Sequence, residues 1–197
     1  LRGATLALTD LEGATLTGAN LSKNGSTATD LQGATLTNAK LIKADLTGAD
    51  LGKNSTGNVK TNLTGADLTG AILKNAQMDD VILTGANLTK ADLTGATLTG
   101  ITIDGASTNF TSAILVGANL EGDILTNVDM EKADLRGAQL GKNSGGTATT
   151  LTGATLSGAN LGKNGSTVTD LSDAILTNAK LIKADLTGAD LSSANLT

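Results

Sequence analysis

The sequence predicts an all-β fold, a parallel β-solenoid in which the chain winds into square coils of 20 residues. The first observation is a large apolar residue at every fifth position, which gives 35 centres between Leu1 and Leu196, 31 of them Leu. The second is Ala two positions before the centre, at 24 of the 34 available places. The third is Gly, Asn or Lys two positions after it. The pattern persists along almost the whole chain and therefore predicts one repetitive architecture.

A period of five fits neither regular element. On an α-helix, steps of five advance about 500°, so the leucines would form no stripe. On a straight strand, residues five apart face opposite sides. The conflict disappears if the chain turns a corner within every unit. Four corners then close a square with each central residue inside, and successive coils stack at about 4.8 Å.

The other positions of the unit agree with this coil. The residue just before the centre is often Asp, Asn or Thr, as at Asp45 and Asp92, which suits an outward position. The residue two after the centre is often Gly, as at Gly48, because tight turns demand a positive φ there. Proline is absent. Its absence suits a backbone whose N–H groups are nearly all needed for pairing between coils.

Segments 44–48 and 91–95 both read Ala-Asp-Leu-Thr-Gly. This motif in tandem resembles the pentapeptide-repeat family. The resemblance implies a right-handed quadrilateral parallel β-helix, and 35 centres at four per coil give about nine coils. We expect a single solenoid domain over residues 1–197. Since both ends fall within the repeat, we also expect this domain to be part of a longer protein.

The five-residue period is interrupted near residues 22–30, 52–62, 104–109, 141–150 and 162–170. Four of these interruptions begin with a Lys-Asn pair, which makes them candidate interaction loops, since loops on a rigid scaffold often carry binding. The candidate residues are Lys23, Asn24, Lys53, Asn54, Lys142, Asn143, Lys163 and Asn164. The alternative is a tolerated insertion that was duplicated with its coils. Residues 15–54 and 155–194 are identical at 31 of 40 positions, which favours that alternative.

If each loop is an excursion from one corner, the loops after Leu21 and Leu161 leave the same corner, seven coils apart. The loops after Leu51 and Leu140 share the adjacent corner. Every interruption resumes with Thr, in place of Ala, two positions before the next centre. We expect its hydroxyl to satisfy a backbone group that the loop leaves unpaired.

Asp123 occupies a position that is usually an inward Ala. A buried carboxylate without a partner is costly, so we expect Asp123 to be hydrogen-bonded locally or turned outward. Asp79 and Asp80 form an adjacent acidic pair, for which we expect a solvated corner rather than a cation site.

The composition argues against catalysis. With no His, Cys, Tyr or Trp, the usual bases, thiol nucleophiles and soft metal ligands are missing. We therefore predict no catalytic, cofactor-binding or metal residues. The net charge of −5 argues against direct nucleic-acid binding. No apolar run is long enough to span a membrane, so a membrane anchor would lie outside this segment.

Ice binding by an outward threonine array is a further alternative. The Thr-Leu-Thr triplets at 15–17, 35–37 and 97–99 fall on three different faces of the predicted coil. No array is expected from them.

Two functions remain open, a structural or interaction scaffold that docks protein partners and an acidic DNA mimic that binds a type II topoisomerase. The mimic, which the resemblance implies, needs dense negative charge along the rod. Acidic residues do concentrate on two neighbouring faces: Asp45, Asp92, Asp134 and Asp185 on one, and Asp30, Asp50, Asp170 and Asp190 on the other. Lysines interrupt these rows, which favours the scaffold. The composition is similar to that of cyanobacterial members, and one membrane-anchored cyanobacterial relative is implicated in localising the heterocyst glycolipid layer.

Overall fold

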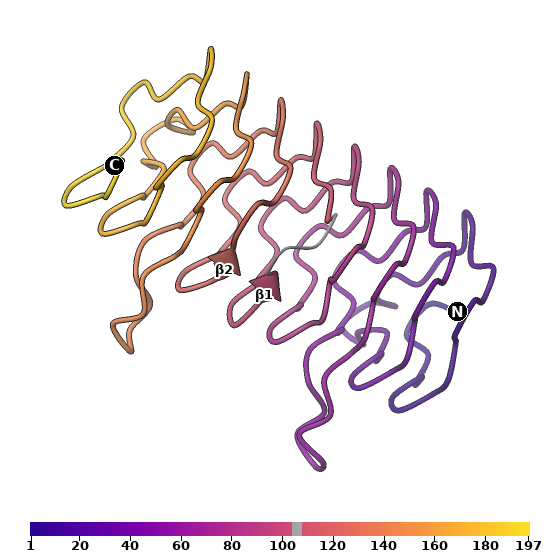
Figure 1. Ribbon diagram of the computed structural model, residues 1–197. Helices are drawn as coiled ribbons and strands as arrows, with labels where there is room; N and C mark the ends of the chain where they lie inside the picture. The colour runs from indigo at the N-terminus through magenta and orange to yellow at the C-terminus, as the bar shows by residue number, and fades with distance from the viewer. Residues whose placement is uncertain (104–107) are drawn as a thin grey trace.

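The computed structural model describes residues 1–103 and 108–197, which form an elongated stack of coils with the two termini at opposite ends (Figure 1). Two strands are long enough to be labelled, β1 (Thr102–Ile103) and β2 (Ile124–Leu125), and they pair in parallel. The other bridges between coils join single residues and are parallel, while two antiparallel bridges lie within loops. No helix occurs in the described ranges. Of the interruption predicted at 104–109, residues 104–107 lie outside the described residues.

The bridges form four ladders, one along each side of the rod, which we call faces 1 to 4 in chain order. Face 1 comprises Thr5, Asp30, Asp50, Gln77, Thr97, Asn119, Gln139, Asp170 and Asp190. Face 2 comprises Asp10, Thr35, Asn62 and Ile82, then Thr102, Ile124, Thr150, Ile175 and Asn195. Face 3 comprises Thr15, Lys40, Asp67, Asn87, Asn109, Asp129, Thr155 and Lys180. Face 4 comprises Asn20, Asp45, Ile72, Asp92, Ile114, Asp134, Asn160 and Asp185. Each face thus presents the residue just before a repeat centre, as the sequence predicts.

The core is a column of central residues lined by the alanines. Leu36, Leu93 and Ala39 are fully buried, as are nearly all their equivalents between Leu21 and Leu176. Most central N–H groups donate to the next coil, as from Leu41 to the carbonyl of Asp67 at 2.7 Å. These hydrogen bonds stack the coils, and burial of the leucines holds them together.

A four-residue turn closes each regular corner. At the corner after Leu36, for example, Ala39 donates to the Leu36 carbonyl at 3.0 Å. The third turn residue has a positive φ, 57° at Asn38 and 63° at Gly48. This explains why Gly and Asn recur two positions after the centre, since both tolerate that conformation.

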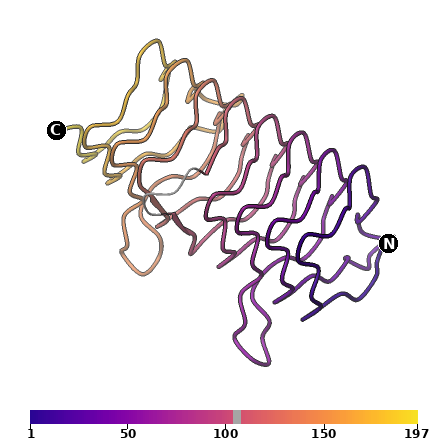
Figure 2. The same cartoon turned by 45° about the vertical axis from the view of Figure 1, so that its right-hand side comes forward.

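The insertions leave the rod without disturbing its ladders. Loops 52–62 (purple) and 141–150 (orange) project from the same side of the stack in both views (Figures 1 and 2). The inserted residues do not change the register of the ladders, because Asp50 still pairs with Gln77 and Gln139 with Asp170 across the insertions.

Candidate functional site

The four Lys-Asn loops lie on two neighbouring corners of the rod. The loops after Leu21 and Leu161 both run from face 4 to face 1, at corner 4–1, and the loops after Leu51 and Leu140 both run from face 1 to face 2, at corner 1–2. The predicted grouping is confirmed. The predicted spacing was one coil too long, since Asn20 and Asn160 are six ladder steps apart on face 4.

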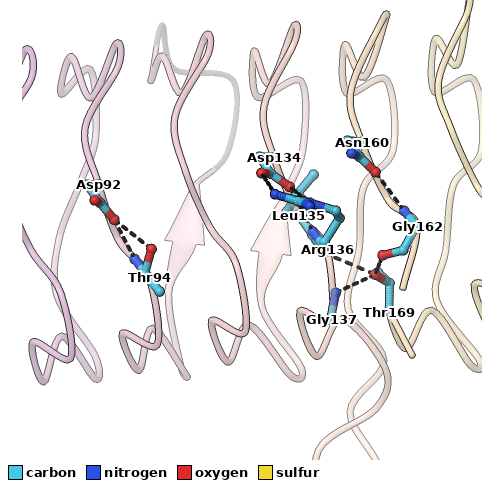
Figure 3. Close-up of polar contacts among 9 residues, drawn as sticks. All are labelled: Asp92, Thr94, Asp134, Leu135, Arg136, Gly137, Asn160, Gly162 and Thr169. Carbon is cyan, nitrogen blue, oxygen red and sulfur yellow. Dashed lines mark hydrogen bonds and ion pairs between the residues drawn. The ribbon is translucent and has the colours of Figure 1, made fainter. Parts of the chain in front are cut away.

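A buried threonine closes the base of every loop. Thr169 Oγ1 donates to the Gly162 carbonyl at 2.7 Å and accepts from the Gly137 N–H, also at 2.7 Å (Figure 3). Thr29, Thr61 and Thr149 make the same pair of contacts, and Thr108 bridges Leu83 and Gly85. The predicted role of these hydroxyls is confirmed. A hydroxyl suits the position because it donates to one carbonyl and accepts from one N–H at the same time.

The asparagines shape the loops themselves. Asn54 is 9% exposed, and its Oδ1 accepts from the N–H groups of Thr56 and Gly57 at 2.9 and 3.2 Å. Asn143 Oδ1 accepts from the Thr147 N–H at 3.0 Å. At corner 4–1 the loops are tight hairpins, in which Asn24 pairs with Thr27 and Asn164 with Thr167.

The corner 1–2 lysines are held in ion pairs. Lys53 Nζ lies 2.7 Å from Asp80, and Lys142 Nζ lies 2.8 Å from Asp173. Lys60 adds a second contact to Asp80 at 3.2 Å. The Lys53 ammonium, helped by Lys60, holds the pKa of the Asp80 carboxyl below its ordinary value against the opposing effect of burial. Sequence reasoning missed these pairs, because the partners come from the next coil.

The corner 4–1 lysines lie differently. The aliphatic stem of Lys23 covers Gly48, with Cδ 2.9 Å from where a Cβ would stand, and Lys163 covers Gly188 in the same way. Both side chains belong to exposed residues. Within the described ranges, neither ammonium makes an ion pair with a carboxylate. Each of these two hairpins therefore presents one ammonium without a carboxylate partner, at a corner bordered by faces 4 and 1.

The acidic rows lie where the sequence places them, on faces 4 and 1. They are partly neutralised. Lys74 lies 3.1 Å from Asp92, and Arg136 binds Asp134 through two hydrogen bonds of 2.8 and 2.6 Å (Figure 3). Asp92 also accepts from the Thr94 hydroxyl at 2.6 Å.

Asp79 and Asp80 are bound by their neighbours at corner 1–2. The Thr97 and Thr99 hydroxyls donate to the Asp79 carboxylate at 2.9 and 2.5 Å, and lysines pair with Asp80. In the described part of the chain, no group of acidic residues has the arrangement of a metal site, and the surface has no pocket.

Asp123 is fully buried and faces the core side of corner 1–2. Its Oδ1 accepts from the Ile101 N–H at 3.0 Å, so the expected local hydrogen bond is confirmed. Its Oδ2 has no hydrogen-bond partner. Burial raises the pKa of this carboxyl to about 8, against the opposing effect of backbone donors at Ile101 and Gly100, and the nearby Asp79 charge raises it further. Asp123 therefore supplies the acceptor for the Ile101 N–H at this irregular corner, at the cost of an unpaired oxygen.

A family model described as pentapeptide repeats matches the chain in eight copies, over residues 1–23, 27–53, 61–100, 106–140 and 169–197. The chain belongs to the pentapeptide-repeat family. Members of this family fold as a right-handed β-helix, as the resemblance implied. The parallel ladders agree with such a helix. The unmatched stretches 24–26 and 54–60 fall within Lys-Asn loops of this pentapeptide-repeat protein.

Solved pentapeptide-repeat structures resemble the chain over most of its length. HetL from the cyanobacterium Nostoc sp. strain PCC 7120, involved in regulating heterocyst differentiation, is 30% identical with a TM-score of 0.55. That match covers 98% of this chain and 87% of HetL. Trypsin-treated QnrB1, a plasmid-mediated fluoroquinolone resistance protein, is 22% identical over 93% of this chain and 89% of its own, with a TM-score of 0.46.

A pentapeptide-repeat protein of the Arabidopsis thaliana thylakoid lumen is 31% identical over 66% of this chain and 70% of its own, with a TM-score of 0.25. None of the curated proteins compared with the chain matches it. Over residues 1–103 and 108–197, no helix has the length and apolar character needed to cross a bilayer.

Proposed function

We propose that this pentapeptide-repeat protein is a non-catalytic scaffold, a rigid single-domain rod of about nine coils over residues 1–197 that docks or spaces protein partners. The observation that supports it is the pair of hairpins at corner 4–1. Lys23 and Lys163 carry exposed ammonium groups there without carboxylate partners in the described ranges. Six ladder steps separate them, which corresponds to about 29 Å along a stiff axis.

Such an edge suits a partner with two acidic patches at matching separation. Two weak contacts held at a fixed distance act together, because binding at the first raises the effective concentration at the second. Of the eight candidate residues, we assign docking to Lys23, Asn24, Lys163 and Asn164. Lys53 and Lys142 are neutralised by Asp80 and Asp173, while Asn54 and Asn143 shape their own loops.

The test compares capture by matched variants in cells. Lys23-Asn24 and Lys163-Asn164 are replaced together by Gly-Ser, and Lys53 and Lys142 together by Ser as the control. The hairpin variant should keep its thermal unfolding profile and lose the captured partner, while the control keeps it. An unchanged set of partners in the hairpin variant would overturn the assignment.

The acidic rows on faces 4 and 1 favour a second candidate, a DNA mimic that binds a type II topoisomerase. Charge-driven binding of this kind is strong at low salt and weakens steeply as salt rises. The ion pairs at Asp92 and Asp134 dilute the rows, so we expect no inhibition of gyrase supercoiling. Inhibition that disappears when Asp45, Asp92, Asp134 and Asp185 are changed to Asn would favour the mimic instead.

Within the scaffold proposal, the cyanobacterial resemblance suggests a setting in glycolipid-layer localisation. That setting stays a prediction. Loss of the glycolipid layer in a deletion strain, restored by the full-length protein, would support it.

A further inference from the structure

Face 2 differs from the other three faces in carrying no charge over most of the rod. From Thr35 onward, every described residue of its ladder is Thr, Asn or Ile. From Thr35 onward, the corner position two residues further on is Thr in each described coil: Thr37, Thr64, Thr84, Thr126, Thr152, Thr177 and Thr197. We call these two columns the threonine face. In the fifth coil the corresponding position is Asp104, which lies outside the described residues.

Most of the corner hydroxyls of this face are not used within the described part of the protein; the exception is Thr197, whose hydroxyl donates to Asn195 Oδ1 at 2.8 Å. On the other faces, several corner threonines are bound by the acidic or amide residue before the centre, as Thr69 is by Asp67 at 2.6 Å and Thr89 by Asn87 at 2.7 Å. On face 2 the residue before the centre is mostly Ile or Thr, which offers no carboxylate or amide acceptor. Among the described residues, the hydroxyls of Thr37, Thr64, Thr84, Thr126, Thr152 and Thr177 make no hydrogen bond to protein.

The ladder sets these groups out on a grid. Residues two apart in a strand are about 6.6 Å apart, and neighbouring coils are about 4.8 Å apart. Buried leucines such as Leu83 and Leu151, both 0% exposed, fix the backbone beneath the grid. Thr and Ile are stiff at χ1, so the methyl and hydroxyl groups are already ordered before anything binds. The grid has one discontinuity, because the ladder makes no bridge between Ile82 and Thr102 in the described structure.

A rigid, neutral, periodic array of hydroxyl and methyl groups suits a ligand that is itself neutral and periodic. Among the described residues of this face from Thr35 onward, ions and charged polymers find no counter-charge. Sugar rings are usually held by exposed aromatic side chains, and the single aromatic residue, Phe110, is 1% exposed. A second copy is also unsuited, because a strip about 40 Å long and about 10 Å wide offers about half of the ~800 Å² that each partner buries in a standard interface.

We propose that the threonine face binds ice, with its hydroxyls joining the ordered water lattice and its methyl groups filling the spaces between surface waters. The intact triplets at 15–17, 35–37 and 97–99 do lie on faces 3, 2 and 1, as expected from sequence. As expected, these triplets do not themselves form an array. The array arises from corner threonines aligned across coils 20 or more residues apart, together with the triplet at 150–152 on the same face.

The test is partition of the purified protein into a slowly growing ice hemisphere, together with thermal hysteresis and inhibition of ice recrystallisation. The unaltered protein should enter the ice and shape the crystals. The double variant Thr126→Lys, Thr152→Lys should fall to the level of a non-binding globular protein, because two long charged side chains lift the face off the lattice.

The matched control is Thr94→Lys, Thr89→Lys, which makes the same change at the same corner position on faces 4 and 3. Unchanged melting curves show that all variants are folded. The control should retain ice uptake. Exclusion of the unaltered protein from ice would overturn the proposal, as would equal loss in the control. Self-association in ultracentrifugation that Thr126→Lys, Thr152→Lys abolishes would also overturn it, because the face would then bind a second copy.

Discussion

The substitution Asp123→Ala should destabilise the rod at low pH and stabilise it at high pH. Ala is the ordinary residue at this inward position. The folded state holds the proton of Asp123 with a pKa of about 8, compared with 3.8 for an unperturbed carboxyl. A group whose pKa is raised by folding stabilises most below its unfolded pKa, and that stability is lost as the pH rises through the folded pKa.

The size of the effect follows from the same values. The rise of the Asp123 pKa from 3.8 to about 8 corresponds to about 6 kcal/mol of folding stability. About 4 kcal/mol of this stability is lost between low pH and pH 7. The Ala variant escapes this loss but leaves the buried Ile101 N–H without its acceptor, which costs about 1–3 kcal/mol. We therefore expect Asp123→Ala to destabilise the rod by about 1–3 kcal/mol at pH 4. At pH 8 it should stabilise the rod by a few kcal/mol.

Urea unfolding midpoints between pH 4 and 9, followed by far-UV circular dichroism, measure this crossover, which should fall at about pH 5–6. Asp45→Ala, which removes an outward carboxylate on face 4, is the control for the loss of a surface carboxylate. Parallel stability curves for Asp123→Ala and the unaltered protein would contradict a raised pKa at Asp123.

Three further changes test the core, the loops and the corner 1–2 ion pairs. Leu83→Asp places a charge in the apolar column and should unfold or split the rod. Thr84→Asp, at the next residue, which faces outward, should lower the free energy of unfolding by less than about 1 kcal/mol. Equal falls in melting temperature for the two variants would contradict the inward position of Leu83. Thr169→Val leaves the Gly162 carbonyl and Gly137 N–H short of a partner, and chemical denaturation should show a loss of about 2–4 kcal/mol, while Thr167→Val at the exposed hairpin should show little. Lys53→Met should raise the Asp80 pKa toward its ordinary value in an NMR titration, since the ion pair lowers it; an unchanged pKa would show that the pair does not form in solution.

The fold was predictable because the same five-residue rule repeats, so each Leu independently indicates an inward position. The corner assignments followed from counting around the loops, and the role of Thr29 and Thr169 followed from the need to pair backbone groups. The pairing of Lys53 with Asp80 did not follow, because a salt bridge depends on side-chain direction across coils rather than on period. The threonine face was missed for a related reason. Thr84 and Thr126 are unremarkable in sequence, and only the ladder shows them in one column with free hydroxyls.

We propose above all that a rigid rod docks a protein through the two hairpins at corner 4–1. Site-specific photo-crosslinking in cells tests it most directly, with a photoreactive residue placed singly at Lys23, Lys163 and, as a control, Lys180 on face 3. The residues placed at Lys23 and Lys163 should crosslink to the same protein, and the residue placed at Lys180 should not. Crosslinks to unrelated proteins from the two hairpins, or the same crosslinks from Lys180, would contradict it.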